Sequence, residues 1–118
     1  MSVHNKIGII GENIAKEYLE KNRYIVLERN FRGKYGEIDL IAKNNEMNII
    51  FIEVKTRTNL QYGSGSESVN FKKKSNIIKT AKKYIYINNI KNKNIRFDVI
   101  EIYIIKNKYM INHIKNAF

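Results

Sequence analysis

The 118-residue chain contains no cysteine, no proline and no tryptophan. The lack of cysteine excludes disulfides, cysteine-ligated zinc, iron–sulfur clusters and thiol nucleophiles, so the fold does not depend on an oxidising compartment. The most apolar stretch, residues 48–54, is far too short to cross a bilayer, and the first ten residues lack the long apolar core of a signal peptide. The sequence therefore predicts a cytoplasmic protein with no membrane partner.

Acidic residues are scarce, because 22 lysines and arginines stand against 11 aspartates and glutamates and give a formal charge of +11. An AT-rich genome would explain part of this excess, because it raises the frequency of lysine together with isoleucine and asparagine, which are also frequent here. The distribution is more informative. Residues 1–59 hold 10 basic and 8 acidic residues, whereas residues 60–118 hold 12 basic and 3 acidic ones. This asymmetry predicts an acidic site beside a basic surface that binds a polyanion such as DNA.

Hydrophobic periodicity predicts the elements of one α/β domain over residues 1–118, because a chain of this length buries a single core. Apolar residues at helical spacing predict a helix over residues 6–21 and a second, lysine-rich helix that Ser68 caps. Alternating or β-branched runs predict strands over residues 24–29, 36–42, 49–55, 95–105 and 109–114. The resulting order is αβββαββ, with the second and third strands in an antiparallel hairpin.

The segments between these elements carry turn residues. Residues 30–36 include two glycines and predict a loop, and in the turn over residues 43–48 Asn44 and Asn45 are suited to a positive φ. Residues 56–68 combine glycine and serine without an apolar period, which predicts a mobile loop.

Three charged residues fall on one face of the predicted hairpin. Alternation places Asp39 on its first strand, and Glu53 and Lys55 on its second, with Val54 turned away. Two adjacent carboxylates suit a hard divalent ion, and a neighbouring lysine can orient or activate water during phosphodiester hydrolysis. An ion pair between Glu53 and Lys55 on a solvated face explains the spacing about as well. Asp39, and Glu12 on the first helix, make the set more restrictive.

Several residues near this set have two open interpretations. Arg29, Arg32 and Arg57 flank the motifs and are suited to gripping phosphates, although a plain solvated face is equally compatible with Arg29. Glu37 shares a face with Asp39 and is either a third ligand or a partner of Arg32, of which the pairing is favoured.

The histidines give a weaker signal. His4 and His113 sit near opposite ends of the chain with no acidic or serine partner at useful spacing, so both are expected on the surface. Asp98 begins an alternating strand, and the pattern does not decide whether its side chain belongs to the sheet or to a subunit contact.

Four segments together resemble a known family. Residues 11–19 (GENIAKEYL), 24–32 (YIVLERNFR), 36–42 (GEIDLIA) and 51–57 (FIEVKTR) closely resemble the YraN family of uncharacterised bacterial proteins. That family is in turn similar to the PD-(D/E)xK restriction-endonuclease-like nucleases, closest to archaeal Holliday-junction resolvases. The resemblance implies a restriction-endonuclease-like fold with a central mixed sheet flanked by helices. It also implies a DNA nuclease dependent on Mg²⁺ or Mn²⁺, with branched or structured DNA as one substrate class.

The resemblance also assigns roles by position. It implies that Asp39 and Glu53 are metal-binding carboxylates, that Lys55 is the catalytic lysine, and that Glu12 and the Val54 carbonyl complete the metal site. The residues expected to bind nucleic acid are Arg32, Arg57, Lys72, Lys73 and Lys79. A resolvase-like reaction needs two cuts and would imply a homodimer. The alternative is a non-catalytic nucleic-acid-binding module with a nuclease-like fold, because many small basic domains bind without cutting.

Overall fold

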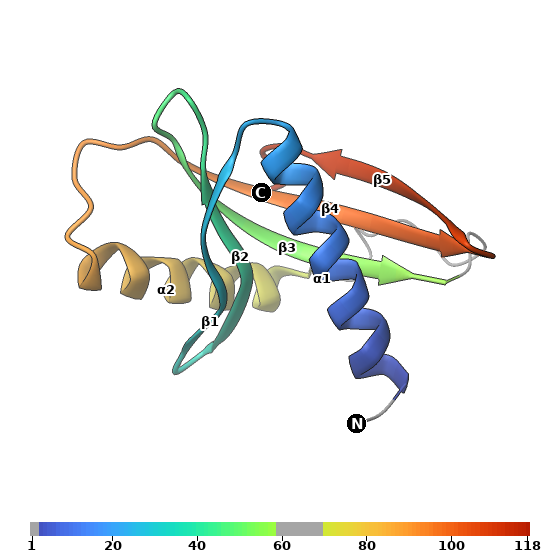
Figure 1. Cartoon of the computed structure of the whole chain (residues 1–118). Helices are drawn as coiled ribbons and strands as arrows, with labels where there is room; N and C mark the ends of the chain where they lie inside the picture. Colours follow the sequence, from blue (N-terminus) through green and yellow to red (C-terminus); the bar gives the residue numbers. More distant parts are fainter. Residues whose placement is uncertain (1–2, 59–69) are drawn as a thin grey trace.

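A computed structural model describes residues 3–58 and 70–118 and has the predicted element order αβββαββ (Figure 1). Its elements are α1 (Val3–Lys21), β1 (Ile25–Gly33), β2 (Gly36–Lys43), β3 (Ile49–Arg57), α2 (Phe71–Ile87), β4 (Ile95–Ile105) and β5 (Lys108–Ile114). The five strands form one sheet in the order β1-β2-β3-β4-β5. Only β3 and β4 pair in parallel within these described ranges, so the sheet is mixed, as predicted.

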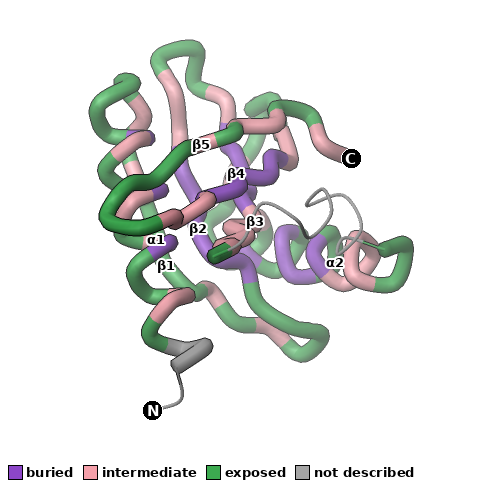
Figure 2. The backbone as a smooth tube through the Cα atoms, turned by 90° about the vertical axis from the view of Figure 1, so that its right-hand side faces the viewer, coloured by how far each residue is buried: buried purple, intermediate pink, exposed green. Residues whose placement is uncertain are grey.

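The two helices cover opposite faces of the sheet, and the buried strands lie between them (Figure 2). Ala15 and Leu19 of α1 pack on one face, and Ile77, Ala81 and Tyr84 of α2 pack on the other. The sheet side chains beneath α1 are Leu40, Ala42, Ile50, Ile52, Ile100 and Ile102, and those beneath α2 are Ile38, Ile41, Ile49 and Phe51. The central strands therefore contribute to two separate apolar clusters. Alternation predicts most of this division, but Ile38 lies in the α2 cluster although period two would place it beside Leu40.

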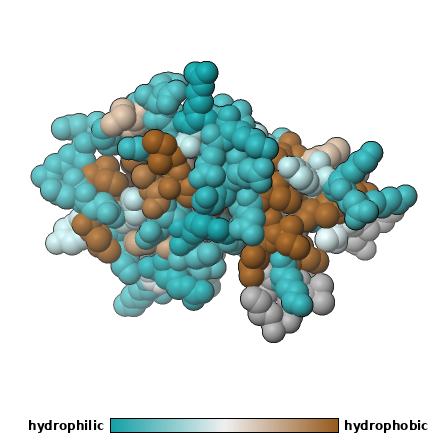
Figure 3. Space-filling view, in the orientation of Figure 1, coloured by the Kyte–Doolittle hydropathy of each residue, from teal (hydrophilic) through white to brown (hydrophobic). Residues whose placement is uncertain are grey.

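Helix α1 lies very close to β3. A Cβ atom added to Gly11 would overlap the side chain of Thr56, so this contact requires glycine. The exposed side of α1 is hydrophilic towards its C-terminal end, whereas Ile9 and Ile10 nearer its N-terminus are exposed apolar residues (Figure 3). Within the described ranges, neither helix is long and apolar enough to cross a membrane.

The prediction of a loop over residues 30–36 is wrong, because most of these residues belong to strands. β1 runs on to Gly33, which pairs with Gly36, and leaves a two-residue turn of Lys34 and Tyr35. Asn30 has a positive φ of 52° at the point where the sequence pattern breaks, and the strand continues through it. The bulge of β1 lies earlier, between Val26 and Glu28.

The residues that form the β2–β3 turn and that cap α2 also differ from those predicted. Between β2 and β3, Met47 takes the positive φ, while the Asn44 side chain accepts hydrogen bonds from two backbone N–H groups. Asn70 caps α2 by accepting a hydrogen bond from the Lys73 N–H at 2.8 Å. The predicted cap Ser68 lies outside the described residues. So does most of the predicted loop 56–68, whose first two residues belong to β3.

A buried polar cluster lies on the α1 face of the sheet. Asp98 is fully buried and accepts two hydrogen bonds of 2.9 Å from the Arg96 guanidinium and one of 3.1 Å from the Asn116 N–H. The Nε2 atom of His113 lies 2.7 Å from the Asp98 carboxylate, and its Nδ1 atom lies 2.9 Å from the Tyr18 hydroxyl. The expected surface position of His113 is therefore wrong, because β5 turns this ring inward beneath α1. Asp98 belongs to the sheet.

Candidate metal centre

The sheet forks at the point where the predicted acidic residues lie. β2 and β3 pair only from Leu40 and Ile52 to Lys43 and Ile49. Beyond this pair β2 turns away with β1, while β3 continues beside β4 (Figure 1). Asp39 and Glu53 are the next residues along the two strands, one on each side of the fork. The end of strand pairing thus sets two carboxylates opposite each other.

At the fork the backbone N–H of Val54 in β3 has no partner in β2, and the side chain of Asp39 accepts its hydrogen bond instead. The Val54 N–H donates a hydrogen bond of 2.8 Å to Oδ2 of Asp39, whose residue is only 8% exposed. Within a strand, the N–H and C=O of one residue point to the same side. The Val54 carbonyl therefore also faces the fork, which is the side where the resemblance expects a metal.

The two carboxyl groups are close enough to interact directly. Burial raises the pKa of Asp39 to about 8, with further contributions from the charge of Glu53 and from a side-chain hydrogen bond to it. With its pKa near 8, the Asp39 carboxyl group is largely protonated at neutral pH, and a bound metal ion would favour its ionised form.

Two lysines lie beside Glu53. Its Oε1 atom is 3.6 Å from Nζ of Lys55 and 3.5 Å from Nζ of Lys73. Burial and the contact with Lys73 lower the pKa of Lys55 to about 8. Burial also disfavours the charged form of Lys73, but its contacts with Lys55 and Glu53 raise its pKa overall. The ion pair between Glu53 and Lys55 is thus present, but both side chains are largely buried, so the expectation of a solvated face is wrong.

Glu12 lies near this group but faces other partners. Its Oε1 atom is 3.8 Å from the Arg29 guanidinium. Burial raises the pKa of Glu12, a hydrogen bond with Asn30 and the Arg29 charge oppose this, and the Glu53 carboxylate adds to it. Within residues 3–58 and 70–118, no three histidine, aspartate or glutamate side chains are grouped to hold one metal ion. The predicted role of Glu12 as a ligand therefore stays a prediction.

A pocket of about 260 Å³ opens onto the two carboxylates. Its lining residues are Tyr35, Gly36, Glu37, Asp39, Glu53, Lys73, Asn76 and Ile77. A larger pocket of about 540 Å³ lies at the β4–β5 hairpin, where its described lining contains no carboxylate. The chemistry of the smaller pocket makes it the candidate site. The sequence pattern does not single out Tyr35 or Asn76, although the flanking Gly33 and Gly36 are a signal for a tight hairpin turn that would project Tyr35.

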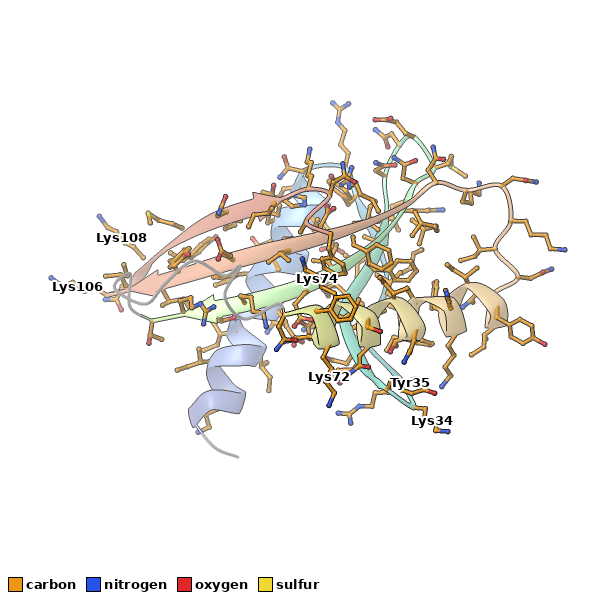
Figure 4. The ribbon with its side chains drawn as sticks, turned by 180° about the vertical axis from the view of Figure 1, so that it is seen from behind. Lys34, Tyr35, Lys72, Lys74, Lys106 and Lys108 are labelled. Atoms are coloured by element: carbon orange, nitrogen blue, oxygen red, sulfur yellow. The ribbon has the colours of Figure 1, made fainter. Side chains whose placement is uncertain are left out.

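The basic residues are distributed more widely than expected. Lys72 and Lys79 are exposed on α2, and Nζ of Lys79 lies 4.5 Å from the ring centroid of Tyr35 at the pocket. Lys106 and Lys108 lie at the far hairpin, away from Lys72 (Figure 4). The surplus charge of residues 60–118 is therefore not confined to one face. Arg32 pairs with Glu37 at 3.3 Å, which is the favoured interpretation of Glu37.

Comparison with known sequences decides the family. A family profile described as "Uncharacterised protein family UPF0102" matches residues 11–102. The chain belongs to the UPF0102 family. It is 48% identical over 118 residues to a UPF0102 protein of Clostridium beijerinckii, covering 98% of this chain and 95% of that relative. It is 53% identical over 115 residues to one of Clostridium botulinum, covering 95% and 93%. A UPF0102 protein of Caldanaerobacter subterraneus is 48% identical over 115 residues, with the same coverage. The predicted YraN membership is thereby confirmed.

Proposed function

We propose that this UPF0102 protein is a divalent-metal-dependent nuclease that hydrolyses phosphodiester bonds in DNA. One observation carries the proposal: the buried Asp39 and the largely buried side chain of Glu53 lie opposite each other at the fork, with Lys55 beside them. Largely buried charged groups stabilise the fold less than apolar side chains of similar volume would. Their presence here therefore favours a functional role. A site that combines paired carboxylates and a lysine of lowered pKa fits phosphodiester hydrolysis.

The residues present fit a hard cation. Asp39, Glu53 and the Val54 carbonyl supply three oxygen-bearing groups to one side of the fork, and Mg²⁺ and Mn²⁺ prefer oxygen ligands. Asp39, whose pKa is raised to about 8, would lose its proton when a cation binds. When bound, a divalent ion supplies charge to the phosphoryl oxygens and lowers the pKa of water.

The chain's own lysines have separate tasks in this proposal. Lys55, with a pKa of about 8, exchanges a proton near neutral pH and donates a hydrogen bond to a phosphate oxygen from Nζ. Lys73 stays charged, and its contact with Glu53 fixes that carboxylate in place. α2 thus positions the site through Lys73 in addition to any contact with DNA.

The alternative function is a nucleic-acid-binding module without catalysis. Two observations favour it. Glu53 already has two lysine partners that can compensate its charge without a metal ion, and no third carboxylate joins the pair within the described ranges. The two functions differ in whether the carboxylates bind metal.

Calorimetric titration with Mn²⁺ separates these functions. We expect the wild type to bind the ion with release of protons, because the Asp39 carboxyl group, with its pKa of about 8, must lose its proton. Asp39→Asn should weaken binding by at least about tenfold, through loss of a ligand charge worth more than about 1.4 kcal/mol. Glu46→Gln, in the exposed β2–β3 turn, is the matched control and should bind as the wild type does. Equal binding by all three proteins, or no binding, would favour the module.

The salt dependence of DNA binding tests the basic side of the site. Replacing Lys72 and Lys79 by alanine should lower the slope of log K against log salt by about 0.9 for each phosphate that is no longer neutralised. Replacing Lys106 and Lys108 removes the same charge at the distant hairpin and should leave the slope unchanged. An equal reduction of the slope in both double variants would mean that total charge, and not this surface, governs binding.

A further inference from the structure

The tip of the β1–β2 hairpin is attached to α2. A Cβ atom added to Gly33 would lie 3.3 Å from the Thr80 side chain, so backbone and helix are in close contact. Nζ of Lys83 donates a hydrogen bond of 3.0 Å to the Arg32 carbonyl. The turn of Lys34 and Tyr35 therefore has a fixed place at the edge of the pocket.

Tyr35 presents an aromatic ring at the mouth of the candidate site. It is 49% exposed, and it lines the same pocket as Asp39 and Glu53. Nζ of Lys79 lies 4.5 Å from the ring centroid, within the range of a cation–π contact. Nζ of Lys34, its neighbour in the turn, lies 5.9 Å from the same centroid and adds a second positive charge (Figure 4). A half-exposed ring among cations is the arrangement that nucleic-acid stacking sites use.

We propose that an unpaired base of the substrate stacks on Tyr35, which thereby positions the neighbouring phosphate to be cut. This inference rests on the proposed nuclease function. Inside a continuous duplex both faces of a base are covered by its neighbours, so a protein ring reaches only bases that are unpaired or flipped out. The surrounding lysines suit the flanking phosphates. The substrate class is then DNA with a single-stranded segment, such as a flap or a branch, in preference to uninterrupted duplex.

The test measures metal-free binding by fluorescence anisotropy, with a flapped duplex and a blunt duplex of equal charge. Stacking is worth about 1 to 3 kcal/mol per base, so Tyr35→Ala should weaken flap binding about 5- to 150-fold. Blunt-duplex binding should change by less than about twofold. Tyr35→Phe keeps the ring and should bind the flap as the wild type does, while Tyr35→Leu keeps apolar bulk and should not.

A matched control and a base-free substrate make the test specific. Tyr86 is 87% exposed in the last turn of α2 and lies outside the pocket, so Tyr86→Ala should have no effect on flap binding. A flap with abasic sites should bind the wild type and Tyr35→Ala equally, because neither complex then has a stacked base. If Tyr35→Ala binds the flap as tightly as Tyr86→Ala does, or if its deficit persists with the abasic flap, the inference is overturned.

The outcome is separable from that of the proposed function. Cleavage of the flapped substrate by the wild type with Mn²⁺, together with no role for Tyr35 in binding, would overturn the stacking role alone. Tyr35-dependent flap binding by a wild type that cuts nothing would support the stacking role and leave the binding module as the function.

Discussion

Replacing Glu53 by glutamine should abolish DNA cleavage while DNA binding without metal stays intact or becomes tighter. Glu53 is the carboxylate that both lysines of the site contact, at 3.5 and 3.6 Å, and it faces Asp39 across the fork. Loss of its charge removes a metal ligand. Because a catalytic metal stabilises the transition state by several kcal/mol, we expect cleavage to fall by about 1,000-fold or more.

Binding should respond in the opposite direction. The carboxylate repels the phosphate backbone in the absence of metal, and its loss leaves the positive charges of Lys55 and Lys73 uncompensated. Cleavage rates with Mn²⁺ and dissociation constants in a chelator measure the two effects on the same substrate. Glu46→Gln, which changes the same charge in an exposed turn, should match the wild type in both. A parallel loss of binding and cleavage in Glu53→Gln would instead indicate a misfolded site.

Asp98→Ala should strongly destabilise the folded state. The fully buried Asp98 carboxylate compensates the Arg96 guanidinium, and its removal leaves that charge unpaired beneath α1. Breaking a buried pair from one side costs about 3 to 5 kcal/mol, which lowers the melting temperature by more than about 10 °C in a domain of this size. Urea unfolding at neutral pH measures the loss. Asp98→Asn, which keeps the shape and part of the hydrogen bonding, should be less destabilising.

The same pair gives a pH dependence of defined sign. Burial opposes ionisation of Asp98, but hydrogen bonds from His113, Arg96 and the Asn116 N–H hold its pKa below the usual value. A carboxylate of lowered pKa contributes its full stability above the unfolded pKa of about 3.9. That contribution is lost as the pH falls through the lower folded pKa. The stability difference between the wild type and Asp98→Ala should therefore be constant near neutrality and shrink in strong acid. A constant difference throughout would exclude Asp98 ionisation as its source.

Periodicity predicts most of the fold because the apolar residues follow their elements closely. Leu19 and Ala15 repeat at helical spacing, and the run from Ile49 to Phe51 reads directly as a core strand. The extension of β1 to Gly33 is not predictable in this way, since its side chains are mostly exposed and Asn30 takes a positive φ within it. Local pattern fails where burial does not dictate the residue.

The site is less predictable from sequence than the fold. Asp39, Glu53 and Lys55 share a strand face, so period-two spacing is enough to place them together. The contact of Lys73 with Glu53 does not follow from spacing, because it depends on how α2 packs across the fork. The inward position of His113 escapes local pattern for a related reason, since its partner Asp98 is 15 residues away and meets it only through β4–β5 pairing.

The central claim is most directly tested by incubating the wild type with linear duplex, single-stranded, flapped and four-way DNAs in the presence of Mg²⁺ or Mn²⁺. We expect strand scission of at least one of these substrates, dependent on the added ion, stopped by a chelator and absent in Glu53→Gln. Scission that persists in Glu53→Gln at the wild-type rate, or a wild type that binds these DNAs and cuts none of them with either ion, would contradict the proposed nuclease.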